Sequence, residues 1–177
     1  MNREQLSHLL RAASRIADEE QIVVIGSQSI LGTYDETQLP PEAVFSMEAD
    51  FAFWNDENNA KSDAVDGVMG EDSQFHATHG YYAQGVSIST AVLPDGWKSR
   101  IVILEGESTK PGRGMCLEPH DAVIAKLVAY REKDLEFSSA LVNAGLVDPH
   151  LLLQRLAMTA LAPTQRERVA RWISSYA

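Results

Sequence analysis

The first fifty residues combine a helical and an extended hydrophobic pattern. Apolar residues recur at helical spacing from Leu6 to Ile16, which predicts an amphipathic helix. The short apolar run Gln21–Ile25 predicts a buried strand. Between residues 45 and 53 every second residue is apolar, as in a strand with one buried face. We expect that face to enter the core through Phe45, Met47, Ala49, Phe51 and Phe53.

A glycine–serine turn follows the first predicted strand. Ser27 is placed to cap a helix that begins near Gln28, because a serine hydroxyl accepts hydrogen bonds from the free N–H groups of a first helical turn. Free N–H groups at a helix start favour phosphate. We therefore take Gly26 and Ser27 as candidate phosphate-binding residues.

Three polar residues, Ser46, Glu48 and Asp50, share the other face of the strand predicted at 45–53. The two carboxylates repel each other unless a cation, a basic side chain or water lies between them. Magnesium binds oxygen ligands and commonly uses one or two carboxylates together with substrate phosphates. The pair predicts a site for Mg²⁺ or Mn²⁺, although an edge strand with a solvated polar face would show the same alternation.

The rest of the chain predicts a mixed sheet followed by helices. We expect a loop over 34–41, a helix over 60–69, and an antiparallel hairpin between strands at 82–93 and 98–104, joined by Pro94-Asp95-Gly96. After Pro119 the pattern predicts roughly three helices. The fold class is α+β: residues 1–118 form a mixed-sheet core with an N-terminal helix, and residues 119–177 form a helical region packed on the same domain.

The order of these motifs resembles the polymerase-beta-type nucleotidyltransferase superfamily. That superfamily has a Gly-Ser or Gly-Gly turn and then Asp-x-Asp on the next strand, which Gly26-Ser27 and Glu48-x-Asp50 resemble. The segments 120–127, 131–134 and 144–148 are similar to a bacterial branch of it. That branch includes abortive-infection nucleotidyltransferase toxins and small uncharacterised nucleotidyltransferase-like proteins.

The resemblance implies a role for each matching residue. Gly26, Ser27 and Ser46 would hold the nucleoside triphosphate, and Glu48 and Asp50 would bind the metal. Two further residues complete the implied catalytic set: Lys126 would contact phosphate, and Asp134 is the acidic residue that follows it. The implied reaction is transfer of a nucleotide from a triphosphate to an acceptor such as tRNA, another RNA or a protein.

Two departures from the superfamily pattern bear on catalysis. Glu48 stands where aspartate is usual, which lengthens the side chain by one methylene. A third carboxylate, expected on a later strand, has three candidates among which the sequence does not choose: Asp95, Glu105 and Glu107.

The helix expected after Pro119 carries the candidate cations. If it runs unbroken through Glu136, one face presents Lys126, Tyr130, Lys133 and Asp134, because positions four and seven apart stack. Alternatively, the two lysines solvate the outside of an amphipathic helix. For Lys133 we favour this alternative. The inner face is then Val123, Ile124, Leu127 and Phe137.

Charge is distributed unevenly along the 177 residues. The net charge of −10 argues against generic nucleic-acid binding, but residues 1–80 hold 15 acidic and 4 basic residues, whereas residues 81–177 hold 10 and 11. The basic residues of the second part could form a local surface for an RNA acceptor. They are Lys126, Arg131, Lys133, Arg155, Arg166, Arg168 and Arg171, the last three being more typical of solvated helix faces and ion pairs.

The remaining composition excludes several classes of site. One cysteine, Cys116, permits no intrachain disulfide and reads as a buried thiol. His76 and His79 form too sparse a pair for a metal site, and we expect them in a loop near the site mouth. We expect His120 to hydrogen-bond at a helix start, and we take Trp54 and Trp97 as packing residues. No long apolar run or targeting segment is present, which favours the cytoplasm and no membrane partner.

Three hypotheses follow from the sequence. The protein is an active, toxin-like nucleotidyltransferase, a nucleotide-binding domain that has lost catalysis, or an interaction protein such as one member of a toxin–antitoxin pair or a homo-oligomer. The first two require one cavity that contains Glu48, Asp50 and Lys126, whereas the third does not.

Overall fold

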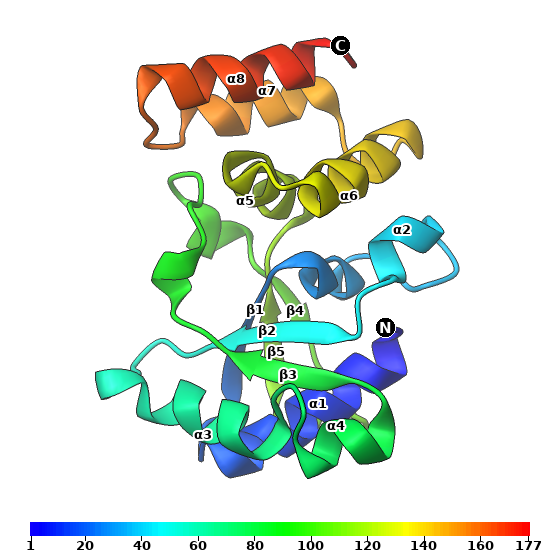
Figure 1. The fold of residues 1–177 in the computed structure, drawn as a ribbon, viewed down its shortest axis with the longest axis vertical. Helices are drawn as coiled ribbons and strands as arrows, with labels where there is room; N and C mark the ends of the chain where they lie inside the picture. Colours follow the sequence, from blue (N-terminus) through cyan, green and yellow to red (C-terminus); the bar gives the residue numbers. More distant parts are fainter.

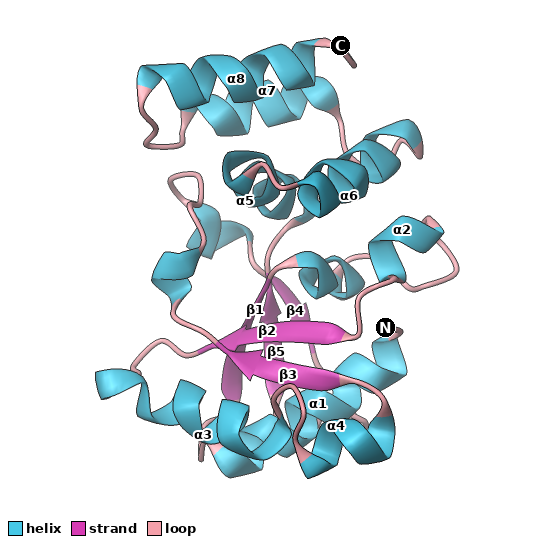
Figure 2. Cartoon of the chain, viewed as in Figure 1, coloured by secondary structure: helices cyan, strands magenta, loops and turns pink.

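A five-stranded mixed sheet occupies the middle of the molecule (Figures 1 and 2). The computed structural model describes residues 1–177, and its strand order is β3-β2-β1-β5-β4. Pairing is antiparallel for β1 with β2 and for β4 with β5, and parallel for β1 with β5 and for β2 with β3. The α+β prediction is confirmed. The strands are β1 Gln21–Ile25, β2 Glu48–Ala52, β3 Tyr82–Gly85, β4 Val102–Leu104 and β5 Arg113–Cys116.

The helices lie on opposite sides of this sheet. In Figure 1, α1, α3 and α4 lie below it, α5 to α8 stack above it, and α2 lies at one side. None of the helices combines the length and apolarity needed to cross a membrane. Their bounds are α1 Arg3–Ile16, α2 Pro41–Val44, α3 Ala60–Met69, α4 Gln74–His79, α5 Pro119–Ala129, α6 Glu132–Asn143, α7 Pro149–Ala157 and α8 Pro163–Ser174. Four short 3₁₀ helices complete the set: η1 Ser27–Gly32, η2 Glu57–Asn59, η3 Ile88–Thr90 and η4 Trp97–Arg100.

The expected amphipathic first helix is present as α1. Asn2 and Gln5 form a reciprocal capping box at its start, which satisfies two otherwise free N–H groups. Its leucine face packs into the main core, where Leu6, Leu9 and Leu10 are fully buried. The periodicity of the sequence therefore identified both this helix and its buried side.

The alternation at 45–53 predicted the core only in part. Ala49, Phe51 and Phe53 are buried as expected. Phe45 is 87% exposed and Met47 is 45% exposed, so their assignment to the core was wrong. The physical reason is that β2 begins only at Glu48, whereas Phe45 caps the end of the short helix α2 and no element covers it.

The predicted hairpin between 82–93 and 98–104 was also wrong. β3 pairs with β2, and β4 pairs with β5, so the two predicted arms lie at opposite edges of the sheet. Residues 86–97 fold over the second face of the sheet instead, where Val86, Ile88 and Trp97 pack against a small buried cluster. The Pro94-Asp95-Gly96 turn leads into η4, with Gly96 in the left-handed region at φ 76°.

The C-terminal region contains four helices where roughly three were predicted. The expected continuous helix breaks at Tyr130, which adopts a left-handed conformation with φ 59°, and α6 starts after Arg131. The predicted inner face is confirmed: Val123, Ile124, Leu127 and Phe137 are buried. His120 lies at the start of α5 as predicted, where it contacts Glu118 and accepts a hydrogen bond from the Asp148 N–H. Cys116 is buried, and burial raises the pKa of its thiol to about 12.

The predicted basic surface is divided in the fold. Arg155 is turned inward, 3.2 Å from the Asp121 carboxylate, with its side chain 17% exposed. Arg166 donates hydrogen bonds to the Leu156 and Thr159 carbonyls at the end of α7, and Arg168 stacks on the Tyr130 ring. These arginines therefore bind the helices to one another. For Arg166 and Arg168 the contacts are with backbone carbonyls and an aromatic ring, not the ion pairs that the sequence favoured.

A buried ion network joins α5 to its neighbours. The Asp121 carboxylate is 1% exposed and accepts hydrogen bonds from Arg100 Nε at 2.8 Å and Nη2 at 3.1 Å. On its other side it contacts Arg155 of α7. One carboxylate thus neutralises two guanidinium groups that are themselves mostly buried.

We expect Asp121→Ala to destabilise the fold by about 3 kcal/mol, because it leaves two mostly buried guanidinium groups without a counterion. Urea unfolding measures the change. The matched control is Glu107→Ala, which removes an ion pair with Lys110 whose side chains are 89% and 66% exposed, and should change stability by less than about 0.5 kcal/mol. Equal losses of stability in the two variants would show that the Asp121 network matters no more to the fold than an exposed ion pair.

Candidate functional site

Gly26 shapes the turn after β1. Its φ of 71° and ψ of −164° lie in a region that only glycine adopts readily. A Cβ at this position would lie 2.0 Å from Asp50 Oδ2, so the missing side chain also leaves room for the Asp50 carboxylate. The turn of β1 and the acidic residue of β2 therefore fit together only with glycine at position 26.

The predicted capping role of Ser27 was wrong. The N-cap of η1 is Gly26, which has no side chain to cap the helix. The Ser29 hydroxyl donates a hydrogen bond to the Gly26 carbonyl at 2.8 Å. The helix expected near Gln28 is present as a 3₁₀ helix of six residues. Ser27 is nevertheless one of the residues that line the cavity described below.

Glu48 and Asp50 lie on one face of β2, beside Ile25 of β1 and next to Tyr82 and Gln84 of β3 in register. Burial and the neighbouring Glu48 carboxylate raise the pKa of Asp50 to about 6, although Lys126 and Lys133 act in the opposite direction. Two acidic side chains are therefore held close together at a cost in electrostatic free energy, with cationic groups nearby.

The cations come from the bend between α5 and α6. Asp134 is fully buried and accepts hydrogen bonds from Arg131, from Nε to Oδ2 at 2.7 Å and from Nη2 to Oδ1 at 3.2 Å. Lys126 Nζ lies 3.1 Å from Oδ1. Burial alone would raise the pKa of Asp134, but Arg131 and Lys126 outweigh it and hold the pKa below its usual value. Asp134 thus fixes two cations at the end of α5 and the start of α6.

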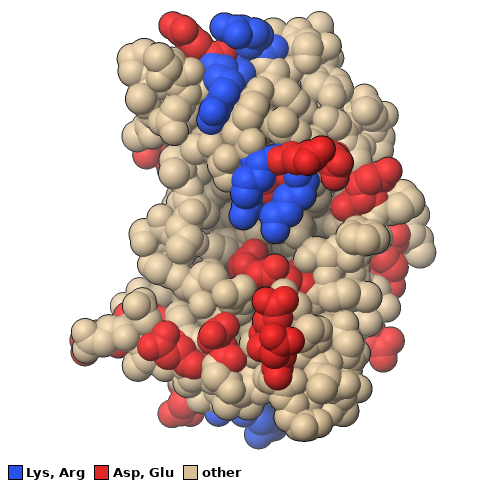
Figure 3. All heavy atoms as spheres, in the orientation of Figure 1, with Lys and Arg blue, Asp and Glu red and all other residues tan.

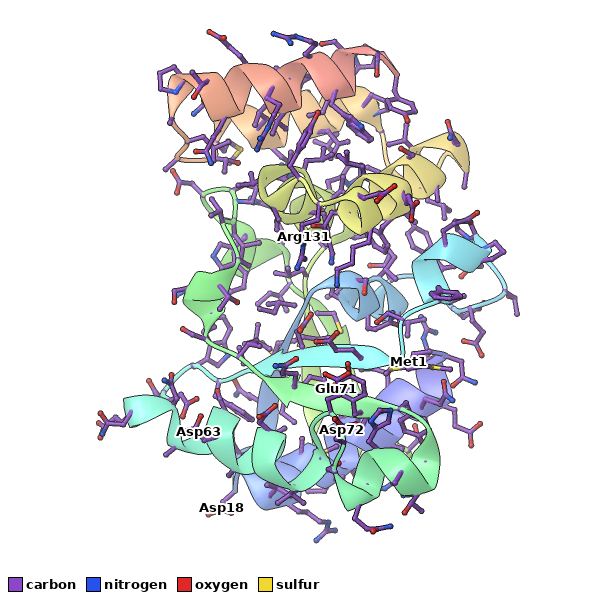
Figure 4. The ribbon with its side chains drawn as sticks, in the orientation of Figure 1. Met1, Asp18, Asp63, Glu71, Asp72 and Arg131 are labelled. Carbon is purple, nitrogen blue, oxygen red and sulfur yellow. The ribbon has the colours of Figure 1, made fainter.

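A cavity of about 500 Å³ lies between these groups. In Figure 3, basic side chains at the middle of the molecule face acidic side chains across a hollow. Figure 4 places Arg131 at the α5–α6 junction, above β2. The cavity is lined by Ser27, Pro41, Glu42, Phe45, Ser46, Glu48, Asp50, Lys126, Arg131, Lys133, Glu136 and Phe137.

Most of the predicted site residues meet in this cavity. Ser27, Ser46, Glu48, Asp50 and Lys126 line it directly. Ser46 also organises the start of β2, because its hydroxyl oxygen accepts a hydrogen bond from the Glu48 N–H. The other two predicted residues lie behind the lining: Gly26 packs against Asp50, and Asp134 holds Lys126.

Sequence reasoning missed several lining residues. Lys133, which we expected to be merely solvated, lines the cavity together with Arg131. Both lie close enough to the acidic pair for charge coupling: Lys133 lowers the pKa of Asp50, and Asp50 and Glu48 help to raise that of Arg131. The alternating charges of the segment Arg131–Asp134 were the signal in the sequence. The helix break at Tyr130, which turns this segment toward the cavity, could not be recognised from the sequence.

None of the three candidates for a third carboxylate lies in the cavity. Glu105 and Glu107 line a wider polar depression of about 830 Å³ elsewhere on the molecule, and Asp95 lies near the end of α7. β3 is the neighbour of β2 on the side away from β1, and its residues level with the acidic pair are Tyr82 and Gln84. A phenol and an amide therefore stand beside Glu48 and Asp50.

The acidic pair fits a divalent cation of the magnesium type. Its metal ligands would be the oxygen atoms of two carboxylates. Burial and the repulsion between the two raise the pKa of Asp50, and an ion of charge +2 between them would remove the repulsion. No third His, Cys, Asp or Glu joins them in a cluster that could hold a metal alone. The remaining ligands would have to be water, neutral oxygen atoms of the protein or a bound substrate, as is common for Mg²⁺.

The two histidines were placed wrongly. His76 and His79 lie on α4, not in a loop, and neither lines the cavity. His79 packs against His8 and Phe75, with ring centroids 4.9 and 4.5 Å apart, and His76 packs against Tyr82. His79 belongs to an aromatic cluster between α1 and α4, whereas His76 contacts β3 through Tyr82. The tryptophans are packing residues as expected: Trp54 and Trp97 stack with centroids 5.5 Å apart.

A family model described as "Nucleotidyltransferase of unknown function (DUF6036)" matches residues 4–176. The chain therefore belongs to this nucleotidyltransferase family. No curated protein and no solved structure matches the chain.

We expect Gly26→Ala to lower stability by about 2 to 4 kcal/mol, because it combines backbone strain with a clash against Asp50. Gly80→Ala is the control: Gly80 also has a positive φ, 74°, but a Cβ there meets no atom within 4 Å, so only about 1 kcal/mol of strain is expected. Thermal and urea unfolding of both variants measure the difference. A Gly26→Ala variant no less stable than Gly80→Ala would contradict the close contact.

We expect Asp50→Asn to be more stable than the wild type at pH 7 without metal, by on the order of 1 to 3 kcal/mol. The Asp50 pKa is about 6 in the fold and 3.8 in the unfolded chain. The protonated carboxyl therefore stabilises the fold fully below pH 3.8, and this contribution is lost as pH rises through 6. Urea unfolding from pH 3.5 to 7.5 should show the two proteins converge at low pH. An Asn variant less stable than the wild type at pH 7 would refute the raised pKa.

Proposed function

We propose that this protein transfers a nucleotide from a nucleoside triphosphate to an acceptor in a reaction that depends on Mg²⁺ or Mn²⁺. The observation that carries the proposal is one cavity with two carboxylates on β2 and three cations from the α5–α6 bend. A metal–triphosphate complex presents both charges at once, and each wall of this cavity complements one of them. Membership in the nucleotidyltransferase family supports the same reaction class.

Each residue has a distinct task in this proposal. Glu48 and Asp50 would hold the metal, which when bound supplies charge neutralisation for the phosphates and the departing pyrophosphate. Lys126 and Lys133 would bind phosphate oxygens as point charges, and Arg131 would do so as a planar fork. Gly26 keeps the Asp50 carboxylate in place, and Asp134 fixes Lys126 and Arg131.

Attack on the α-phosphate also needs a proton acceptor. Asp50 would serve the metal rather than this proton, because a bound cation lowers the pKa of its carboxyl from the metal-free value of about 6. The proton of the attacking hydroxyl would pass to water. The acceptor in this proposal is the hydroxyl of an RNA, such as tRNA, or of a protein, as in a toxin-like enzyme. The protein would be toxin-like if the modification inactivates that acceptor.

A second candidate function is nucleotide binding without catalysis. Tyr82 and Gln84 of β3, level with the acidic pair, provide no third carboxylate, and Glu48 replaces the usual aspartate. A site with two carboxylates can still hold one metal ion and a triphosphate. The cavity thus serves both candidates, and turnover distinguishes them.

Isothermal titration of the four ribonucleoside triphosphates with Mg²⁺ tests the shared prediction. We expect the wild type to bind them, and Glu48→Gln/Asp50→Asn to lose most of the metal-dependent affinity, because amides are much weaker metal ligands than carboxylates. The control is Glu105→Gln/Glu107→Gln, which removes the same charge from the separate depression and should bind normally. Mass analysis of RNA and protein after incubation then detects transfer.

Failure of the wild type to bind any triphosphate would refute both nucleotide functions and leave the interaction protein as the remaining hypothesis. Binding without any modified acceptor or released pyrophosphate would favour the second candidate. Equal loss of binding in the control and the site variant would show that net charge alone, rather than the β2 pair, governs affinity.

A further inference from the structure

Phe45 is an exposed aromatic residue on the wall of a charged cavity. Its side chain is 87% exposed, the highest value among the large hydrophobic residues of the chain, and it lies among the residues that line the cavity. Single exposed hydrophobic residues are ordinary at a protein surface. The position of Phe45 is less ordinary, because it borders the space where the acidic pair and the cations meet.

Phe45 gives the cavity an apolar end. Pro41 starts the short helix α2, whose end Phe45 caps, and Phe137 lines the cavity from α6, against which α2 packs. The Phe137 ring centroid is 5.8 Å from Lys126 Nζ. Glu48 follows Phe45 by three positions, so the aromatic ring and this carboxylate are attached to backbone positions at most about 10 Å apart. The cavity can therefore accept a molecule with a charged end and a flat, apolar end.

Two further carboxylates mark the walls near this apolar end. Glu42 lies on α2 and Glu136 on α6, one on each of the two elements that hold the apolar residues. Both residues are exposed, and no protein donor is bound to either side chain. Ionised carboxylates only accept hydrogen bonds, so they favour a ligand with N–H donors on its flat end.

We propose that Phe45 is the stacking platform for the nucleobase and that Glu42 and Glu136 select bases that carry an amino group. Adenine, guanine and cytosine offer amino donors, which carboxylates accept, whereas uracil presents carbonyl oxygens in their place. Stacking on an aromatic ring binds any base, and the carboxylates add the preference. This inference rests on the proposed function, since the base must belong to the triphosphate bound at Glu48 and Asp50.

The platform is tested with a ligand that has no base. Phe45→Ala should bind ATP, GTP and CTP about 5- to 100-fold more weakly than the wild type, because one aromatic stacking contact is lost. Inorganic tripolyphosphate with Mg²⁺ should bind both proteins equally. Phe45→Trp is the matched variant and should retain nucleotide affinity. Phe45 is exposed, so its replacement should leave the thermal midpoint unchanged, and circular dichroism checks the fold.

The carboxylates are tested by the ranking of the four triphosphates. We expect the wild type to bind UTP at least about 5-fold more weakly than CTP, since one well-formed base contact discriminates by this much or more. Glu42→Gln/Glu136→Gln should narrow the difference, because an amide can also donate to the uracil carbonyl oxygens. Tripolyphosphate affinity should rise only slightly in this variant.

The outcomes separate this inference from the proposed function. Tripolyphosphate bound as tightly as the nucleotides, or nucleotides bound equally by Phe45→Ala and the wild type, would overturn the platform and leave the metal–phosphate site intact. Equal wild-type affinity for UTP and CTP would overturn the role of the carboxylates. Binding of neither tripolyphosphate nor any nucleotide would overturn both proposals.

Discussion

The Asp50 carboxylate rests against the backbone of Gly26, where a Cβ would lie 2.0 Å from Oδ2. This contact joins the turn after β1 to the polar face of β2, and it requires both a glycine and its unusual backbone conformation. Asp50 is partly shielded from water here, and Glu48 lies beside it, so its carboxyl group takes up protons more readily than a free one. The geometry thus makes the two ionised carboxylates unfavourable in the metal-free protein. A bound cation removes that unfavourable free energy, which strengthens its binding.

The basic half depends on a different contact. Asp134 is fully buried, and its two oxygens are shared between Arg131 and Lys126. The left-handed residue Tyr130 ends α5 and allows α6 to turn back, so that Arg131 and Lys133 face the sheet. Lys126 and Arg131 are therefore held before any ligand arrives, which lowers the entropy lost when phosphate binds. Lys133 is exposed and depends less on this framework.

Local patterns predicted the parts of the fold that depend on local physics. The buried strand β1, the leucine face of α1 and the inner face of α5 follow from hydrophobic period alone, and the structure has them. Glu48 and Asp50 were found because a strand alternates sides. The same rule failed for Phe45 and Met47, since alternation cannot show where a strand begins or which element covers it.

Strand pairing and chain reversal were the parts that sequence could not supply. The segment 82–104 contains two strands and a good turn, yet each strand pairs with a different neighbour, because the residues between them pack on the second face of the sheet. Tyr130 carries no signal for a left-handed conformation, so the reversal that directs Lys133 to the cavity was hidden. Such features arise from contacts between distant segments, which outweigh local propensity.

The uneven charge of the sequence has a structural counterpart in the two walls of the cavity. Glu48 and Asp50 come from the first part of the chain and the three cations from the second, and the fold brings these two walls against each other. Glu48 and Asp50 form no ion pair with the lysines across this cavity of about 500 Å³. The facing charges are therefore not a surface ion network. Lys126 is paired with Asp134 instead, behind the wall. The two walls are therefore kept apart while each remains incompletely neutralised, and a ligand that carries both a cation and an anion satisfies both of them.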